Sequence, residues 1–214
     1  MIFTATRFSG AYVIEPERLE DERGFFARSY DEQEFAARGL RTRWMQSNIS
    51  YSQTRGTLRG LHYQVAPHPE AKLVRCTLGA LYDVIVDLRP ASPTYKHWLS
   101  FELTAANRRL LYIPEGMGHG FQTLADETEI FYQMSETHHP ECARGLRWDD
   151  PALGIKWPIE NDPILSNRDR SFALPSKVAA ARRSKTTAFD LCRRVRPRSK
   201  NRLGQSKARI RLAA

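Results

Sequence analysis

Two short glycine-bounded segments each carry a histidine that could do acid–base chemistry. The first, residues 59–64, has the sequence RGLHYQ, and the second, residues 114–120, has the sequence PEGMGHG and is predicted to be a turn. Glycine permits tight backbone geometry, and histidine changes its charge near neutral pH. A lone histidine is more often a hydrogen-bonded structural residue than a catalytic one, but His62 and His119 together make a structural and a functional role about equally consistent with the sequence.

Three other side chains could take part in the same chemistry. Lys72 opens the strand-like segment 72–76, where the simpler interpretation is a solvated lysine at a strand end. Tyr132 shares a strand face with Ile130 and Met134, so it is either a core tyrosine or a proton donor inside a cavity. Asp169, within residues 165–170, has by itself the pattern of a loop acid. The residues alone leave these alternatives open.

The ligand types argue against a metal centre. Gln64 stands where a histidine pair with His62 would need its second member, and His62 with His119 is one ligand short of a usual three-ligand centre. The three cysteines, Cys76, Cys142 and Cys192, are widely spaced and match no metal-binding or disulfide pattern. We therefore expect no metal or other cofactor, and a reducing, cytoplasmic compartment.

Length and composition set the frame for these residues. The chain has 214 residues, of which 41% are hydrophobic and 10% aromatic, enough for one folded domain with an appendage and too apolar for a wholly disordered protein. No apolar run approaches the roughly 20 residues that span a bilayer, and the first residues lack the pattern of a signal peptide. A soluble protein without a membrane partner is expected.

The net charge of +9 is unevenly distributed. Residues 176–214 hold thirteen lysines and arginines against one acid, a charge of +12, which leaves residues 1–175 with −3. We predict a folded domain over 1–175 and a basic, disordered extension over 176–214. Such an arm could contact nucleic acid or an anionic membrane, but with Phe189 as its one aromatic residue it lacks stacking platforms. A solvated extension unrelated to the activity is favoured.

The pattern of residues 1–175 predicts mostly strands. In residues 82–88, Val84, Val86 and Leu88 fall on one face, while Asp83 and Asp87 fall on the other. Further strand-like runs, separated by turn signals, cover residues 72–76, 99–103, 109–113, 120–124 and 129–134. Many short strands at regular spacing favour an antiparallel sandwich or barrel.

Helical signals are few. Residues 31–39 are predicted to form a short surface helix, because Asp31 can cap its start and a glycine follows its end. Residues 107–110 fit either one helical turn or a loop.

Taken together, these motifs resemble the dTDP-4-dehydrorhamnose 3,5-epimerase family. The matching stretches, in the family order, lie at residues 21–26, 46–50, 56–64, 72–75, 83–89, 113–116, 119–121, 147–151 and 157–158, followed by Ser166 and Asp169. The RGLHYQ motif is highly specific. The resemblance covers residues 1 to about 175 and implies a cupin-like antiparallel β-barrel, or jelly roll, with a few short helices. It implies an isomerase that needs no metal or redox cofactor and acts in deoxysugar or surface-polysaccharide synthesis.

The resemblance also implies a reaction. The substrate would be a dTDP-linked 4-keto-6-deoxy sugar, whose C3 and C5 protons lie beside the ketone and can be removed through an enolate. By family position His62 is the base, Asp169 orients its imidazole, and Tyr132 is the acid that returns the proton. Lys72 stabilises the developing oxyanion, with His119 nearby.

Seven residues are implied to contact the substrate. Guanidinium groups suit a diphosphate or sugar, amides supply neutral contacts, and the Phe25-Phe26 region would reach the site of a neighbouring subunit in a homodimer. The implied contacts are Arg23, Phe26, Gln46, Asn48, Arg59, His119 and Arg168. In a straight strand Arg59 and His62 would point to opposite faces. A bend or bulge at Gly60 would let them converge, but the strand pattern does not itself predict one.

Some positions depart from the family pattern. Arg28 and Ala143 stand where glutamates associated with ligand binding are common, and His138 replaces an aromatic residue near the strand that follows the acid. Met117 and Gly118 replace a phenylalanine and an alanine. The departures put the identity of the nucleotide, and the inversion of both carbons, in question.

Two alternatives remain beside the double epimerase. One is a single-centre epimerase or ketoisomerase acting on another nucleotide 4-keto sugar. The other, from a different class, is a non-catalytic protein that binds sugar, or binds nucleic acid through its basic arm. The complete set of base, aspartate and acid favours catalysis.

Overall fold

The fold is built almost entirely from antiparallel strands. The computed structural model describes residues 1–160 and 162–172, and within them it contains thirteen strands and two short helices. Every pairing between these strands is antiparallel. The all-β prediction is confirmed. The predicted extension, residues 176–214, lies outside the described residues, so its boundary stays a prediction.

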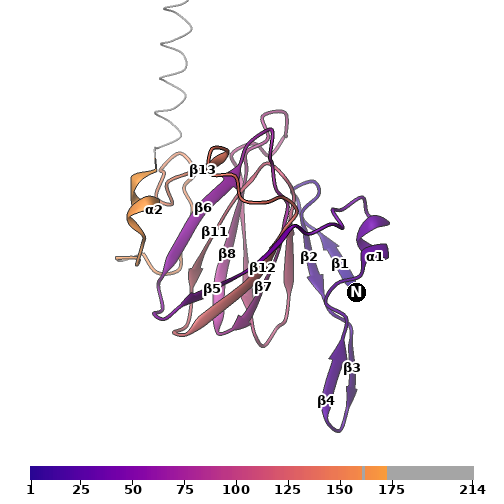
Figure 1. Ribbon diagram of the computed structural model, residues 1–214. Helices are drawn as coiled ribbons and strands as arrows, with labels where there is room; N and C mark the ends of the chain where they lie inside the picture. The colour runs from indigo at the N-terminus through magenta and orange to yellow at the C-terminus, as the bar shows by residue number, and fades with distance from the viewer. Residues whose placement is uncertain (161, 173–214) are drawn as a thin grey trace, which may run out of the picture. The chain divides into compact units, whose positions relative to one another are not determined.

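Two sheets make up the folded body (Figure 1). The six-stranded sheet runs in the order β1 (Ile2–Ala5), β2 (Tyr12–Glu15), β10 (Leu110–Ile113), β7 (Lys72–Leu78), β12 (Thr128–Met134), β5 (Gln46–Ser52). The five-stranded sheet runs in the order β13 (Ala143–Gly145), β6 (Leu58–Gln64), β11 (Met117–Thr123), β8 (Ala80–Asp87), β9 (Trp98–Thr104). Apart from β1–β2 and β8–β9, neighbouring strands in each sheet are far apart in sequence, as in a jelly roll.

The main hydrophobic core lies between the two sheets. Val74 and Ile130 from the six-stranded sheet pack in one buried cluster with Ile85 and Phe121 from the five-stranded sheet. Because strand side chains alternate in direction, the other face of β8 must be covered separately. A second cluster, which includes Val84, does this.

Because both faces of β8 are covered, its aspartates are buried although the sequence pattern suggests a face exposed to solvent. Asp83 and Asp87 alternate with valines in β8, a pattern that usually marks a polar, solvated face. Both aspartates are 0% exposed in the structure. Asp87 is bound by Arg89, Ser92 and Thr94, whereas Asp83 bonds His119 at the candidate site.

The N-terminal region adds a helix and a two-stranded hairpin. Helix α1 (Glu32–Ala36) starts where expected, since the Asp31 side chain accepts hydrogen bonds from the first-turn amides, and it is shorter than the predicted 31–39. Strands β3 (Arg18–Asp21) and β4 (Gly24–Ala27) form a hairpin that reaches away from the two sheets (Figure 1).

Two segments were ambiguous or differ from the sequence prediction. The glycine-rich segment 114–120 is a turn only as far as Gly116, where the backbone φ is +80°. Strand β11 then begins at Met117, so His119 lies within a strand and not in a turn. Residues 107–109 precede β10 without forming a helix. Among the described helices, none is long and apolar enough to cross a membrane.

Candidate active site

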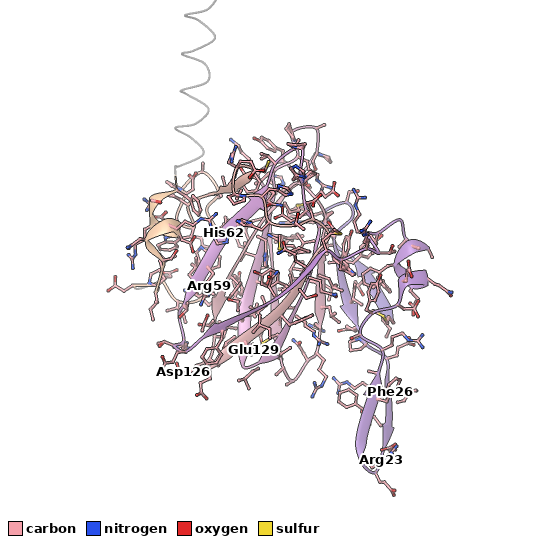
Figure 2. The ribbon with its side chains drawn as sticks, in the orientation of Figure 1. Arg23, Phe26, Arg59, His62, Asp126 and Glu129 are labelled. Atoms are coloured by element: carbon pink, nitrogen blue, oxygen red, sulfur yellow. The ribbon has the colours of Figure 1, made fainter. Side chains whose placement is uncertain are left out.

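A bulge in β6 brings Arg59 and His62 to the same side. His62 pairs with His119 on β11, Arg59 pairs with Phe121, and the register shifts between these two pairs. Gly60 sits at the shift with φ of +125°, and a Cβ atom there would lie 2.5 Å from the Gly120 Cα. Glycine is therefore required for both the backbone angle and the close approach. The bend that lets the two residues converge is therefore present, and Figure 2 shows Arg59 and His62 on the same strand.

The two side chains line a cavity of about 540 Å³. Its wall combines residues from both sheets with the segment around α2 (Asn167–Ser171). All four expected catalytic residues are on this wall: His62, Lys72, Tyr132 and Asp169. Three of the expected substrate contacts are there too, Arg59, His119 and Arg168.

His62 forms a close pair with Asp169, 107 positions away. The His62 Nε2 lies 2.7 Å from the Asp169 Oδ1. Asp169 is 3% exposed and sits in the first turn of α2, where its backbone amide donates to the Ser166 hydroxyl. It is thus a buried, oriented carboxylate and not a surface loop acid.

The environment of Asp169 keeps its carboxylate ionised. Burial acts to raise the pKa of this carboxyl, but the hydrogen bonds from the His62 ring and the Gly60 amide outweigh it, and the pKa lies below its usual range. An ionised carboxylate against one ring nitrogen fixes the imidazole and stabilises its protonated form. This arrangement suits His62 to accept a proton from a substrate.

Lys72 is buried, which corrects the interpretation of a solvated strand-end lysine. It is 7% exposed, its Nζ lies 3.2 Å from the Glu70 Oε1, and it donates to the His62 carbonyl oxygen at 3.3 Å. The solvent interpretation failed because β7 is a central strand of its sheet, between β10 and β12. A lysine held there places an ammonium group on the cavity wall.

Tyr132 faces the cavity from the sheet opposite to His62. It lies on β12 in the six-stranded sheet, whereas His62 lies on β6 in the five-stranded sheet. Burial raises the pKa of the Tyr132 phenol above its ordinary value, although the nearby Arg59 charge acts in the other direction. The phenol therefore keeps its proton at neutral pH and can donate it.

A second histidine–aspartate pair lies deeper in the wall. The His119 Nε2 is 2.9 Å from the Asp83 Oδ2, and the two side chains are 9% and 0% exposed. Burial raises the pKa of the Asp83 carboxyl, although the neighbouring His119 and Lys72 favour its charged form. His119 and Lys72 thus line the same cavity, while the Asp83 carboxyl group that bonds His119 stays buried.

The remaining expected contacts are not on the wall. Gln46 accepts a hydrogen bond from the His138 amide, and the Asn48 amide lies 3.6 Å from the Met134 sulfur. Arg23 and Phe26 sit on the β3–β4 hairpin, far from Arg59 and His62 (Figure 2).

The structure adds wall residues to which the sequence analysis assigned no role. They are Ser50, Thr57, Tyr63, Glu70 and Arg144, together with His138, noted above only as a departure. Tyr63 could have been found, since it lies inside the RGLHYQ motif. Glu70 gives no signal, because a single acid after a proline is typical of a loop.

Histidines and carboxylates also meet outside the cavity wall. His68, Glu136 and His139 bring potential metal-ligand atoms within 4.8 Å of one another. The two imidazoles stack in parallel, with centroids 3.5 Å apart and planes 7° apart, so their in-plane nitrogen lone pairs do not converge on one point. At the candidate site, the Nε2 atoms of both His62 and His119 face carboxylates.

Comparisons with known proteins agree with this geometry. Residues 5–176 match the family model for dTDP-4-dehydrorhamnose 3,5-epimerase. A relative of that name from Methanothermobacter thermautotrophicus is 46% identical over 172 residues, covering 79% of this chain and 92% of the relative. A Streptomyces niveus relative named dTDP-4-dehydrorhamnose 3-epimerase is 42% identical over 173 residues, covering 80% of this chain and 83% of the relative.

Two solved structures are similar to this chain in both fold and sequence. The dTDP-4-dehydrorhamnose 3,5-epimerase of Bacillus anthracis, with TDP and PPi bound, superposes with a TM-score of 0.78 at 42% identity, covering 81% of this chain and 98% of that one. The Legionella pneumophila enzyme, in complex with dTDP-4-keto-L-rhamnose, gives 0.77 at 35% identity, covering 84% and 95%. These similarities extend over the part of the chain that forms the two sheets and the cavity.

Proposed function

The chain belongs to the dTDP-4-dehydrorhamnose 3,5-epimerase family, and on that premise we propose that it inverts C3 and C5 of a dTDP-4-keto-6-deoxy sugar. The observation that carries the proposal is the His62–Asp169 pair, with 2.7 Å between the bonded atoms, on the wall of a cavity that Tyr132 enters from the opposite sheet. A base and an acid on opposite walls are what inversion of a carbon centre requires.

His62 starts the reaction as the base. Its Nε2 bonds Asp169, so Nδ1 is the atom that takes the proton from the carbon beside the ketone. The electron pair of the broken C–H bond moves into the ring and onto the C4 oxygen, which gives an enolate. The ionised Asp169 carboxylate stabilises the imidazolium that forms.

Lys72 stabilises the enolate oxygen. Its ammonium lies in a wall region that is largely closed to water, where a positive charge acts more strongly on a developing negative charge than it does in water. His119 lies on the same wall and adds polar stabilisation near the oxygen.

Tyr132 completes the inversion from the other face. The phenol donates its proton to the carbon on the side opposite to His62, so that the enolate collapses to the inverted ketone. Solvent then takes the proton from the His62 imidazolium and returns one to the Tyr132 phenolate, which restores the base and the acid. Applied once at C3 and once at C5, this cycle converts a dTDP-4-dehydro-6-deoxyglucose into a dTDP-4-dehydrorhamnose.

Two arginines are assigned to bind the diphosphate of the substrate. Arg59 and Arg168 line the cavity, and their guanidinium groups match phosphate oxygens. Gln46 and Asn48, which lie off the cavity wall, are assigned neutral contacts with the substrate, and both neighbour wall residues: Gln46 bonds the His138 amide and Asn48 lies beside Met134. We include in the proposal that the chain works as a cytoplasmic homodimer.

The homodimer accounts for the two expected contacts on the hairpin. Phe26 is 68% exposed, and it and Arg23 reach the cavity of the neighbouring subunit. Each hairpin thereby completes the active site of the other subunit, and that subunit supplies the base and the acid.

A single-centre epimerase is the second candidate. His138 lines the cavity where the family commonly has an aromatic residue, and the Streptomyces niveus relative is named a 3-epimerase. A changed residue near the acid could leave one of the two carbons without its proton return.

Proton NMR in heavy water tests the proposal. The purified protein is incubated with dTDP-4-keto-6-deoxyglucose, and deuterium at C3 and C5 is followed over time. Deuterium at both carbons with rhamnose-type product is expected, whereas deuterium at C3 alone identifies the single-centre enzyme. No exchange on this sugar or on its analogues with other nucleotides contradicts the proposal.

A further inference from the structure

Glu70 is a buried carboxylate on the cavity wall that the proposed chemistry leaves without a task. It precedes β7 by two residues, and its side chain is 3% exposed. Its Oε1 lies 3.2 Å from the Lys72 Nζ. Its Oε2 is also buried and has no hydrogen-bond partner within the described part of the chain.

This pair is poorly built for stability. Burying two charges costs free energy that is recovered only when the geometry is good and the remaining lone pairs are satisfied. A carboxylate that keeps one oxygen unpartnered does not meet that condition, and such groups in native proteins call for an explanation. The explanation here lies in what Glu70 does to Lys72.

The contacts of Lys72 show what that is. An ammonium group has three N–H donors. One points to Glu70 and another to the His62 carbonyl oxygen, which ties the lysine to the strand that carries the base. The third is left for an oxygen in the cavity.

From this arrangement we propose that Glu70 is a positioning residue, which anchors the Lys72 Nζ and aims it at the substrate's C4 oxygen. The inference rests on the proposed function, because it assigns Glu70 to the stabilisation of that enolate. Glu70 acts through Lys72 and does not itself touch the sugar.

Other charged groups also face Lys72 and set how much Glu70 contributes. Asp83 on β8 interacts with the Lys72 charge and bonds His119 on β11, while Tyr132 on β12 and the His62–Asp169 pair line the same cavity. Asp83 is therefore the second carboxyl group close to Lys72, and it limits how much of the lysine's position is lost when Glu70 is replaced.

Two variants separate charge from position. Glu70→Gln keeps the shape and an acceptor oxygen but removes the charge, so the hydrogen bond that holds Lys72 weakens and kcat falls about tenfold. Glu70→Ala removes both, and kcat falls about 10²-fold, in the range for loss of an oxyanion donor. KM stays within about twofold of the wild type in both, so the loss is confined to kcat. The matched control is Glu129→Gln, an acid on β12 outside the cavity wall that accepts from Thr77 and leaves kcat and KM unchanged.

A third measurement guards against a purely structural role. In Glu70→Leu with Lys72→Met, apolar groups of similar size replace the buried pair, which is expected to keep or raise the unfolding temperature while exchange is lost. Unchanged kcat in Glu70→Gln and Glu70→Ala, or collapse of the double variant, overturns the inference. These outcomes are distinct from failure of the proposed function, in which the wild type itself shows no exchange.

Discussion

The cavity contains the same chemical pair twice, and the two copies differ in their surroundings. In the first, the His62 side chain is 38% exposed and its aspartate 5% exposed; in the second, His119 is 9% exposed and its aspartate fully buried. The bonded distances are similar, 2.7 and 2.9 Å. What differs is access to the cavity and the number of donors around each carboxylate.

That difference shifts the pKa values of the two carboxyl groups in opposite directions. Asp169 accepts from the His62 ring, and the Gly60 amide also donates to it at 3.4 Å, which together bring its pKa below the ordinary value despite burial. Asp83 has one oxygen with no partner in the described part of the chain, and burial raises its pKa. Environment, not residue type, makes one pair a candidate for proton abstraction and the other a support.

Removing each imidazole gives the largest expected contrast. His62→Ala should lower deuterium exchange about 10³-fold, because no other cavity group replaces an oriented base. His119→Ala should lower it about tenfold, but it should cost more stability, about 3 kcal/mol, since it leaves a buried carboxyl without its partner. NMR exchange rates and urea unfolding check both. Equal losses of exchange would remove the distinction between the pairs.

Removing each carboxylate charge sharpens the same point. Asp169→Asn should lower exchange about 10²-fold, because an amide cannot stabilise the imidazolium and can hold the ring in the wrong tautomer. Asp83→Asn should lower it less than about fivefold. Rates measured with retained dTDP affinity, by calorimetry, separate loss of chemistry from loss of folding. A larger effect at Asp83 would reverse the roles assigned here.

The Tyr132→Phe variant tests which group returns the proton to the carbon. If the phenol does so, C–H abstraction by His62 continues, but inversion at one or both carbons should slow by about 10- to 10²-fold. Product stereochemistry and deuterium content at C3 and C5 measure this directly. Normal inversion in Tyr132→Phe, together with its loss in His119→Ala, would move the acid's role to the second pair.

The two pairs also differ in how well the sequence predicted them. His62 stands in a specific motif, and its family position implied Asp169 as a partner. No local pattern could have shown that contact, because 107 residues separate them. Asp83 was assigned to a face opposite the valines, which is correct, but alternation does not tell whether that face meets water or a second sheet.

Burial near a strand end was equally hidden. The residues alone favoured a solvated Lys72, although its family position implied a role at the oxyanion, and Glu70 was given no role. Their burial depends on β7 lying between β10 and β12. The strand pattern and the helix start at Asp31 were predictable, because turn chemistry and backbone sterics act locally. The bend at Gly60 was needed for Arg59 and His62 to converge, but the strand pattern itself did not predict it. Side chains that meet across the barrel depend on topology, which the pattern of one strand does not contain.

The smallest expected effect is on the pH dependence of stability, to which Asp169 and Asp83 should contribute with opposite sign. The folded-state pKa of Asp169 lies below its ordinary value of 3.8. Its contribution to stability is therefore present above pH 3.8 and is lost as the pH falls through the lowered pKa. The folded-state pKa of Asp83 lies above 3.8, so its contribution is present below pH 3.8 and is lost as the pH rises through the raised pKa.

Urea unfolding of the wild type, Asp169→Asn and Asp83→Asn between pH 3 and 7 measures both contributions. The wild-type advantage over Asp169→Asn should grow with pH to about 1.5–3 kcal/mol, the range for a hydrogen bond to a charged group. The advantage over Asp83→Asn should shrink over the same range, because the wild type must either ionise a buried carboxyl or hold its proton at a cost. Parallel curves would mean that the two carboxyls have the same environment, and the contrast on which the assignment of base and support depends would be lost.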